Sequence, residues 1–434
     1  MKAIGGAWWR WRFTPLSEGT KVTRLELFFD LVFVYAFFNM ARSTSEDFNL
    51  DGLLRGLLVL SLLWWCWCSY VMTGNSVRTD AGIMPVVLFA AMAVIFVASL
   101  AIPQSFTTER PGTLSAPLVF AICYFLVRAL HLSIFWYAAH NNPLLRHQLL
   151  RITVPTLVAT LLLVAAALLP QQLVDQPHRF DARVALWSLA VIIEYATSFA
   201  VGFRGFDIPS AAHCAERYAL ITTIAFGEAI ISVGTGAREV GPSITWPLIG
   251  AAVLGIVLTA CLWWAYFDLI ALAAEQVLRE LHGPARVALA RDAYNYLHLP
   301  MIAGIIMLSL GAEKLLRATG KPATMHQPLH GLALYLLYGG TILFLLGHLC
   351  FQLRALRTVS WTRVTTIVLL AGLIPLAGHM PGLGALALLT AVGLALTITE
   401  LVIFAGPRRA LRAAVHQEAV SHAARETEWR RQHR

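Results

Sequence analysis

The sequence predicts an all-α integral membrane protein with about twelve transmembrane helices, arranged as two parallel six-helix repeats. Three observations predict this fold: an apolar composition, a succession of apolar runs of about helix-spanning length, and basic residues gathered on one side of those runs. Hydrophobic residues make up 58% of the 434 residues and charged residues 13%, whereas soluble domains are about 45–50% apolar and about 25% charged. The composition therefore excludes a disordered chain or a disulfide-rich secreted domain and argues against an ordinary soluble enzyme.

The apolar runs can be counted, because a bilayer core about 30 Å thick needs about 20 mostly apolar residues in helical form. Lipid offers no partner to free backbone groups, so the spans must be helices. The first and eleventh runs are the shortest candidates. The expected spans cover residues 25–41, 53–72, 82–102, 116–139, 149–169, 184–203, 217–234, 246–271, 294–312, 332–351, 364–379 and 383–405.

Basic residues predict the orientation of the chain. The N-terminus, the even-numbered loops and the C-terminal tail carry 23 of the 33 Lys and Arg residues, against 8 in the opposite loops. Cytoplasmic loops carry the excess of basic residues in membrane proteins, so we expect both termini in the cytoplasm. This distribution accounts for most of the formal charge of +9, and no nucleic-acid partner is needed to explain it.

The two ends of the chain look like anchors rather than spans. Residues 1–24 carry charges and three tryptophans but no apolar core, so we expect no cleavable signal peptide and assign an interfacial cytoplasmic segment. The tail, residues 406–434, is polar and basic, which is typical of a helix on an anionic membrane surface. The six cysteines are scattered and lack metal spacing, so we interpret them as reduced packing residues.

The two halves, residues 25–203 and 204–405, resemble each other in the order of their polar landmarks. An even-numbered repeat keeps its orientation, so the halves would be parallel and would meet at an interface, where transporters place their sites. The alternative is that apolar helices resemble one another by composition alone. The matching landmarks are Asp30 with Glu228, Leu63-Trp64-Trp65 with Leu262-Trp263-Trp264, Asp80-Ala81 with Asp292-Ala293, His131 with His348, Arg151 with Arg363, and Glu194 with Glu400.

The first span carries the densest set of charges. Glu26 and Asp30 are four residues apart and share one face of the helix. Two stacked carboxylates repel each other unless a cation or a proton lies between them. The candidate cations are Arg24, Arg55 and Arg128. The pair is either a proton- or cation-handling site or a buried ion-pair network that holds the bundle together.

The seventh span carries a second set. His213, Glu216 and Arg217 lie within one turn at its cytoplasmic end, and we interpret Glu216 and Arg217 as an interfacial pair. Glu228 lies about three turns deeper, and Gly227 beside it would allow another helix to approach closely. A charge at that depth is costly and is functional by default. Glu228 is therefore the stronger functional candidate.

The remaining buried polar residues carry weaker signals. A lone acid or histidine in a helix is more often a satisfied packing residue than a ligand, although histidine suits proton relay. No metal-binding, phosphate-binding, dinucleotide-binding or nucleophile motif occurs, so we expect no metal, no cofactor and no catalytic residues. These weaker candidates are Glu194, His131, His298, His348 and Asp268.

Two stretches resemble a known family. Arg24-Leu-Glu-Leu-Phe-Phe-Asp30-Leu-Val-Phe-Val resembles the opening signature of the bacterial low temperature requirement A membrane proteins. His213-Cys-Ala-Glu216-Arg217-Tyr-Ala-Leu, followed by Gly227-Glu228, resembles the second signature of that family. The region from Tyr294 to Ile306 is similar to a later part. The resemblance implies a multi-pass protein of the bacterial cytoplasmic membrane with a link to growth in the cold, and it leaves the biochemistry open.

A shorter likeness concerns the first span alone. Its Arg, Glu, Phe and Asp positions fall in register with the signature of lysosomal-type potassium channels and their bacterial relatives, with Phe29 in place of serine and Leu31 in place of a small residue. In those channels the signature mainly braces the pore helices. The likeness implies ion permeation, or a bracing role for the same residues.

Three functions fit these observations. The first is a secondary transporter or ion-permeation protein for a proton, a monovalent cation or a small molecule, with buried acids on the first and seventh helices. The second is a structural or sensory protein of the bilayer that acts in cold adaptation. The third is a membrane-embedded enzyme for lipids, which the short loops and the missing nucleophile motif disfavour.

Overall fold

The computed structural model describes residues 20–75, 77–106, 114–138, 143–173, 178–201, 208–238, 244–414 and 417. These residues form helices joined by short connections, and no strand occurs among them. The tryptophans expected to anchor the N-terminus (Trp8, Trp9 and Trp11) and most of the basic tail lie outside the described residues.

The first half of the chain forms six long helices in the order that the apolar runs predict. The expected spans and the helices overlap one to one here. The helices are α1 (Arg24–Glu46), α2 (Leu50–Gly74), α3 (Met84–Ala101) with the short 3-10 turn η1 (Ile102–Gln104), α4 (Ala116–Ala138), α5 (Pro143–Leu173) and α6 (Arg179–Val201).

The second half contains six long helices and three short elements that the sequence analysis treated as a loop. The short elements begin with α9, whose Ile270, Ala274 and Leu278 are buried at a spacing of four residues. A search for runs of about 20 apolar residues cannot detect such a short amphipathic helix. The elements are α7 (Ala211–Arg238), α8 (Trp246–Phe267), α9 (Ile270–Glu280), α10 (Gly283–Leu289), the π-helix η3 (Ala290–Tyr296), α11 (His298–Thr319), α12 (Leu332–Leu356), α13 (Trp361–Ala377) and α14 (Gly382–Ile403).

Local signals decide where several helices begin. The side chain of Thr23 accepts the backbone N–H of Glu26, and Glu26 reaches back to the backbone N–H of Thr23, which makes a capping box at the start of α1. Asn49 caps α2 and Thr245 caps α8 in the simpler way, through one side-chain oxygen. These caps satisfy backbone donors that would otherwise be buried without partners.

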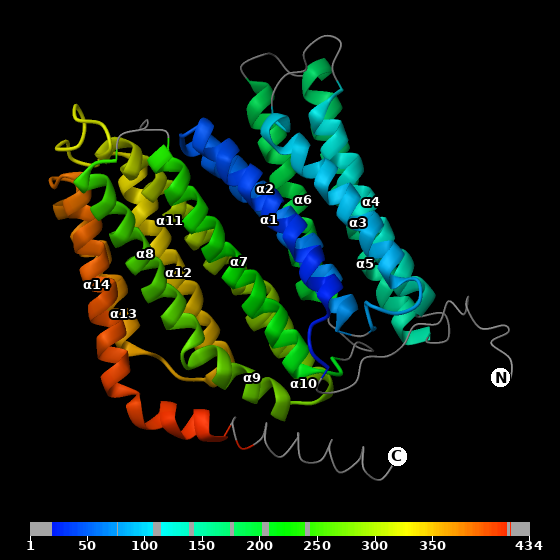
Figure 1. The fold of residues 1–434 in the computed structure, drawn as a ribbon. Coiled ribbons are helices and arrows are strands. Elements are labelled where there is room, and N and C mark those ends of the chain that lie inside the picture. The colour runs from blue at the N-terminus through cyan, green and yellow to red at the C-terminus, as the bar shows by residue number, and fades with distance from the viewer. Residues whose placement is uncertain are drawn as a thin grey trace, which may run out of the picture.

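The helices of the two halves lie on opposite sides of a junction formed by α1 and α7 (Figure 1). Helices α2 to α6 pack on the α1 side, and α8 to α14 pack on the α7 side. Helix α11 packs along α7 and also reaches α1 and α2 across the junction. The packing order within each half is similar, because α1 contacts α2 and α3 as α7 contacts α8 and α11.

Ten helices among the described residues are long and apolar enough to cross a membrane. Their outer faces expose large apolar side chains, such as Leu161 at 66% and Val402 at 72% exposure. Surfaces of this kind are stable in lipid but not in water. Two helices fall outside the ten: α13 is only 17 residues long, and α1 carries Arg24, Glu26 and Asp30 in its first turns.

Residues 405–414 form a helix that runs across the end of the bundle near α9 (Figure 1). Asp268, at the end of α8, holds it in place. Arg408 Nε donates to Asp268 Oδ2 at 2.7 Å, and Arg412 Nη2 donates to Asp268 Oδ1 at 3.0 Å. The sequence predicted Asp268 to be a buried acid without a specific partner. In the structure it binds Arg408 and Arg412, at the start of the basic tail.

The closest helix contact joins α11 and α12 through glycines. A Cβ atom added at Gly340 would lie 2.4 Å from the backbone nitrogen of Leu308, and one added at Gly304 would lie 2.5 Å from that of Phe344. Small residues at such positions let helix backbones touch, which replaces the missing hydrophobic driving force within lipid. By contrast, Gly339, next to Gly340, faces no atom within 4 Å.

We expect Gly340→Ala to destabilise the bundle and Gly339→Ala to leave it unchanged. The added methyl group at residue 340 meets backbone, which cannot rotate away, so the cost should be about 1–3 kcal/mol. Thermal unfolding of both variants in detergent measures the difference. Equal melting temperatures for the two variants would contradict this packing argument.

Candidate functional site

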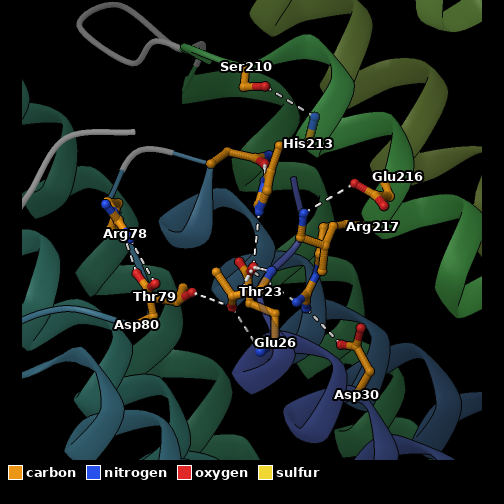
Figure 2. Close-up of polar contacts among 12 residues, drawn as sticks. Thr23, Glu26, Asp30, Arg78, Thr79, Asp80, Ser210, His213, Glu216 and Arg217 are labelled. Atoms are coloured by element: carbon orange, nitrogen blue, oxygen red, sulfur yellow. Dashed lines mark hydrogen bonds and ion pairs between the residues drawn. The ribbon is translucent and has the colours of Figure 1, made fainter. Parts of the chain in front are cut away.

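A cluster of buried charges joins the first turns of α1 and α7 (Figure 2). Glu26 is 3% exposed, and its Oε2 accepts the backbone N–H of Thr23 at 2.8 Å and the Thr23 hydroxyl at 2.9 Å. The same oxygen lies 3.1 Å from Nε2 of His213 on α7. Gly74 on α2 leaves room for the carboxylate, since a Cβ atom there would lie 2.7 Å from Glu26 Oε1.

One turn further along, Asp30 pairs with Arg217. Both side chains are fully buried, and Arg217 Nη2 donates to Asp30 Oδ1 at 2.7 Å. Trp67 on α2 donates its indole N–H to the same oxygen at 2.8 Å, and the Arg217 guanidinium stands over the Trp67 ring. Arg217 Nη1 also lies 3.8 Å from Glu26 Oε1, so one cation serves two carboxylates.

The register of α1 against α7 produces both pairs. Glu26 and His213, and Asp30 and Arg217, are each separated by 187 residues in the chain. Asp30 therefore lies in the second turn of α1, at the level of Arg217, and not at the centre of a span. Glu228 lies in the fifth turn of α7, so it is deeper along its helix than Asp30, with which the sequence analysis matched it.

His213 is bonded through both of its ring nitrogens, to Asn75 and to Glu26. Its Nδ1 lies 2.8 Å from Asn75 Oδ1, and its Nε2 lies 3.1 Å from Glu26 Oε2. With the Asn75 amide oxygen facing the ring, both ring nitrogens face acceptors, whereas a neutral imidazole has one N–H to donate. A neutral His213 satisfies both contacts only when the Asn75 amide is turned so that its nitrogen, which has no partner in the present orientation, faces the ring; in the present orientation the pair holds one further proton.

Three of the expected partners lie elsewhere. Arg24 is exposed, Arg55 pairs with Asp47, and Arg128 pairs with Glu194 inside the first half. Helix periodicity showed which acids share a face, but it could not show which distant helix supplies the cation. The partner on α7 depends on tertiary packing alone.

The expected interfacial pair of Glu216 with Arg217 is also wrong. Adjacent residues on a helix point about 100° apart, and here Arg217 turns into the junction while Glu216 stays exposed. Glu216 accepts the backbone N–H of Val22 at 3.1 Å. Nearby, Arg78 donates to Asp80 between α2 and α3 and holds the pKa of that carboxyl below its usual range.

Glu228 lies deeper on α7 and is 1% exposed. Its two carboxylate oxygens accept hydrogen bonds from the hydroxyl groups of Ser232, at 2.5 Å, and of Ser309 on α11, at 3.1 Å. No basic side chain forms an ion pair with Glu228 among the described residues. The sequence led us to expect another helix close to Gly227. The structure has none there, because no atom lies within 4 Å of the position that a Cβ atom would take.

Glu228 is separated from the junction cluster by a segment with buried aromatic side chains. Ten residues of α7 lie between Arg217 and Glu228, so the two are about 16 Å apart along the helix axis. On α1, Phe33 and Phe37 are fully buried over the same length. Beyond Glu228, the buried Glu313 on α11 accepts from Ser45 at the end of α1 at 2.7 Å. The α1–α7–α11 junction thus carries acids at three levels.

A second cluster lies inside the first half, away from α7. Arg128 on α4 donates to Glu194 on α6 at 3.1 Å, and the Trp65 indole and the Tyr124 hydroxyl donate to the same carboxylate at 2.9 and 2.7 Å. His131 lies one turn from Arg128, and neither of its ring nitrogens has a hydrogen-bond partner. The carbonyl of Ser69 is near that ring but outside hydrogen-bond geometry.

The second half contains a comparable cluster. Arg363 on α13 donates to Glu400 on α14 at 2.8 and 3.0 Å and also bonds His348 on α12. His298 is bonded to the Tyr266 hydroxyl at 2.8 Å and to the Ala293 carbonyl at 3.1 Å. His298 is thus satisfied through both ring nitrogens, whereas Nε2 of His348 has no hydrogen-bond partner. No group of three metal-binding side chains occurs in the described part of the chain.

Sequence reasoning missed several residues that complete these clusters. Thr23 could have been found, because Thr-x-x-Glu is the signature of a capping box. Trp67, Asn75 and Ser309 carry no local signal, since each becomes a partner only when its helix packs against α1 or α7. The arrangement places buried carboxylates against an arginine, a histidine, a tryptophan and serine hydroxyls.

We expect Arg217→Leu to destabilise the protein strongly, because it leaves Asp30 and Glu26 buried without their shared cation. Removing one partner of a buried pair costs about 3–5 kcal/mol. Adding Asp30→Asn to Arg217→Leu should recover part of that loss. Thermal unfolding of the single and double variants measures this, and Glu216→Gln, on the exposed side of the same turn, is the control. A loss in the double variant equal to the sum of the two single losses would argue against the pair.

The comparisons with known proteins agree with the two sequence signatures. Residues 21–398 match the model of a family described as bacterial low temperature requirement A protein (LtrA). The chain is also similar to an uncharacterized protein of Rhizobium meliloti (strain 1021), at 27% identity over 411 residues that cover 92% of this chain and 93% of the relative. No solved structure matches. The match extends over both halves and both charged turns, and the chain belongs to the bacterial low temperature requirement A family.

Proposed function

We propose that the protein is a proton-linked secondary transporter or ion-permeation protein whose route follows the α1–α7–α11 junction. The observation that carries the proposal is the buried contact of His213 with Glu26 across the two helices, at which we propose that a proton is shared. A buried site that must hold a proton in one conformation can release it in another, and this is the elementary step of proton coupling.

The charge count of the junction supports this proposal. Glu26, Asp30 and Arg217 leave one negative charge in a region that water does not reach, and a proton on His213 or Glu26 cancels it. Asp30 Oδ2 and Arg217 Nη1 have no hydrogen-bond partner, so the cluster retains capacity to rearrange. Glu228 has two serine hydroxyls and no counter-cation, so it too must carry a proton or a cation.

The proposal includes two parallel six-helix repeats. Thr23 and Ser210 cap α1 and α7 in the same way, each accepting from the backbone N–H three residues on. Each half also buries one Arg–Glu pair, with a histidine nearby. A pseudo-two-fold axis between α1 and α7 would bring residues at matching positions face to face, which is how the two 187-residue pairs are arranged.

We also propose that α1 and α13 cross the membrane, which gives twelve spans in the bacterial cytoplasmic membrane with both termini inside. Helix α1 is 23 residues long and runs beside α7 (Figure 1). Its acids face Arg217 and His213 rather than lipid, which removes the penalty that its composition suggests. In this orientation the junction cluster lies near the cytoplasm and Glu313 near the opposite surface.

Transport would require the junction to change shape. Phe33, Phe37 and the neighbouring Ala36 are fully buried between the cluster and Glu228, so this conformation is closed to ions in the middle. Rocking of one half against the other around the α1–α7 contact would open the two ends in turn.

We expect purified wild-type protein in liposomes to carry a proton flux under an imposed pH gradient, either alone or together with a sodium, potassium or organic-solute gradient. Glu228→Gln and Asp30→Asn should abolish it, because an amide cannot release the proton that each step requires. A pH-sensitive dye inside the vesicles measures the flux. Variants enter the assay only if their melting temperatures show that they fold.

The control is Glu216→Gln, which changes an exposed acid one residue from Arg217 and should keep the wild-type flux. Absence of flux in the wild type under every gradient, together with early melting of Asp30→Asn, would exclude the transport proposal. That result would favour a structural or sensory protein for cold adaptation, which the close Asp30–Arg217–Trp67 contact also supports.

A further inference from the structure

A cavity of about 70 Å³ lies between α2, α4, α5 and α6, with Asn295 of η3 also on its wall. None of the residues that line it belongs to α1, α7 or α11. Its wall is mainly apolar, with Phe135, Leu149, Ile152 and Pro155 on one part of it. The polar residues of the second cluster, Arg128, His131 and Glu194, form another part of the same wall.

The wall has hydrogen-bonding capacity that the protein does not use. Arg128 is 1% exposed, and its Nη atoms are bonded to Ser69, Thr156 and Glu194, but its Nε–H has no partner. His131 is 7% exposed and uses neither ring nitrogen. Buried polar groups are normally paired, and each exception requires an explanation.

The second half shows that this arrangement is not imposed by the fold. There, Arg363 bonds His348 directly, so Nδ1 of that histidine is satisfied within the protein. In the first half the corresponding arginine, Arg128, lies on α4, the same helix as His131. Arg128 does not bond His131, which lies beside the cavity. Among the described residues, His131 has neither ring nitrogen bonded and lines a cavity, whereas His348 has one ring nitrogen bonded by Arg363.

We propose that this cavity binds a small monocarboxylic acid of the size of acetate, with its carboxylate between Arg128 Nε and His131. The N–H groups of Arg128 Nε and of the His131 ring have no acceptor. Arginine and protonated histidine form strong hydrogen bonds with carboxylates. The apolar wall suits a methyl group. A cavity of about 150 Å³ holds the six carbon atoms of benzene, so 70 Å³ holds about three non-hydrogen atoms; acetate has four, and the cavity is partly open to its surroundings.

The charge balance requires that the acid arrive with its proton. Arg128 and Glu194 already cancel each other, so an added carboxylate would be uncompensated. The acid O–H proton passes to His131, and the site then holds a carboxylate beside an imidazolium. The groups that face His131 are Arg128 on its own helix, Tyr70 on α2 and Glu194 on α6, while α5 contributes only apolar side chains to this wall.

The proposal does not depend on transport and is tested by binding to the full-length protein in detergent. We expect acetate labelled with ¹³C to bind saturably in NMR, and calorimetry in two buffers to show that a proton is taken up with each acetate. Propionate should bind more weakly, and benzoate should not bind. Chloride should not compete, because it lacks the planar pair of acceptor oxygens, and acetamide should not compete, because it carries no charge.

Two variants locate the site. His131→Phe keeps a ring in place and should weaken acetate binding roughly tenfold or more, through loss of a charged hydrogen bond. Thr197→Leu fills the cavity without removing a bonded group and should abolish binding with no fall in melting temperature. His282→Phe makes the same change at an exposed histidine and should bind acetate as the wild type does.

Three outcomes would overturn the proposal. One is that acetate shows no saturable binding, in which case the cavity holds only water. Another is that acetamide or chloride competes equally, which would show that the carboxylate is not recognised. The last is that both His131→Phe and Thr197→Leu bind as the wild type does. If His131→Phe unfolds, Thr197→Leu alone decides. Proton flux in liposomes is measured separately, so its absence leaves this result unaffected.

Discussion

The structure depends on the pairing of buried charges across the contact of α1 with α7. Glu26 and Asp30 cannot remain charged inside a helical bundle unless cations or protons accompany them. Arg217 and His213 provide these from the other half of the chain, 187 residues away. This pairing fixes the register of the two helices, since a slide of one residue would turn a carboxylate toward an apolar wall. The placement of both halves follows from it.

The same principle organises the interior of each half. Apolar helix faces do not distinguish a neighbouring helix from lipid, so polar pairs and close backbone contacts must specify which helices meet. Arg128 with Glu194, and Arg363 with Glu400, each join two helices of one half. Between α11 and α12 the glycines Gly304 and Gly340 have the corresponding role through backbone contact. The large apolar surface then faces outward.

The clusters differ in which polar groups lack a hydrogen-bond partner or a counter-charge. The functional proposals rest on these differences. In the second-half cluster Arg363 satisfies one ring nitrogen of His348. In the junction cluster both ring nitrogens of His213 are engaged, by Asn75 and Glu26, and Glu228 has no ion-pair partner among the described residues. The first-half cluster leaves His131 without partners beside a cavity. A purely structural network has no reason to retain such incomplete sites, because each one costs stability.

The sequence by itself determined the membrane class, the family and the position of every long helix, because a span needs a long apolar run whatever its neighbours are. It also identified Glu26, Asp30 and Glu228 as buried acids, since each lies within an apolar run. Only the tertiary structure decided their partners. Arg217 rather than Arg24 neutralises Asp30, and Asp268 binds the tail. Contacts between helices that lie far apart in the chain leave no periodic pattern, and the short amphipathic α9 contains too few apolar residues to register as a run.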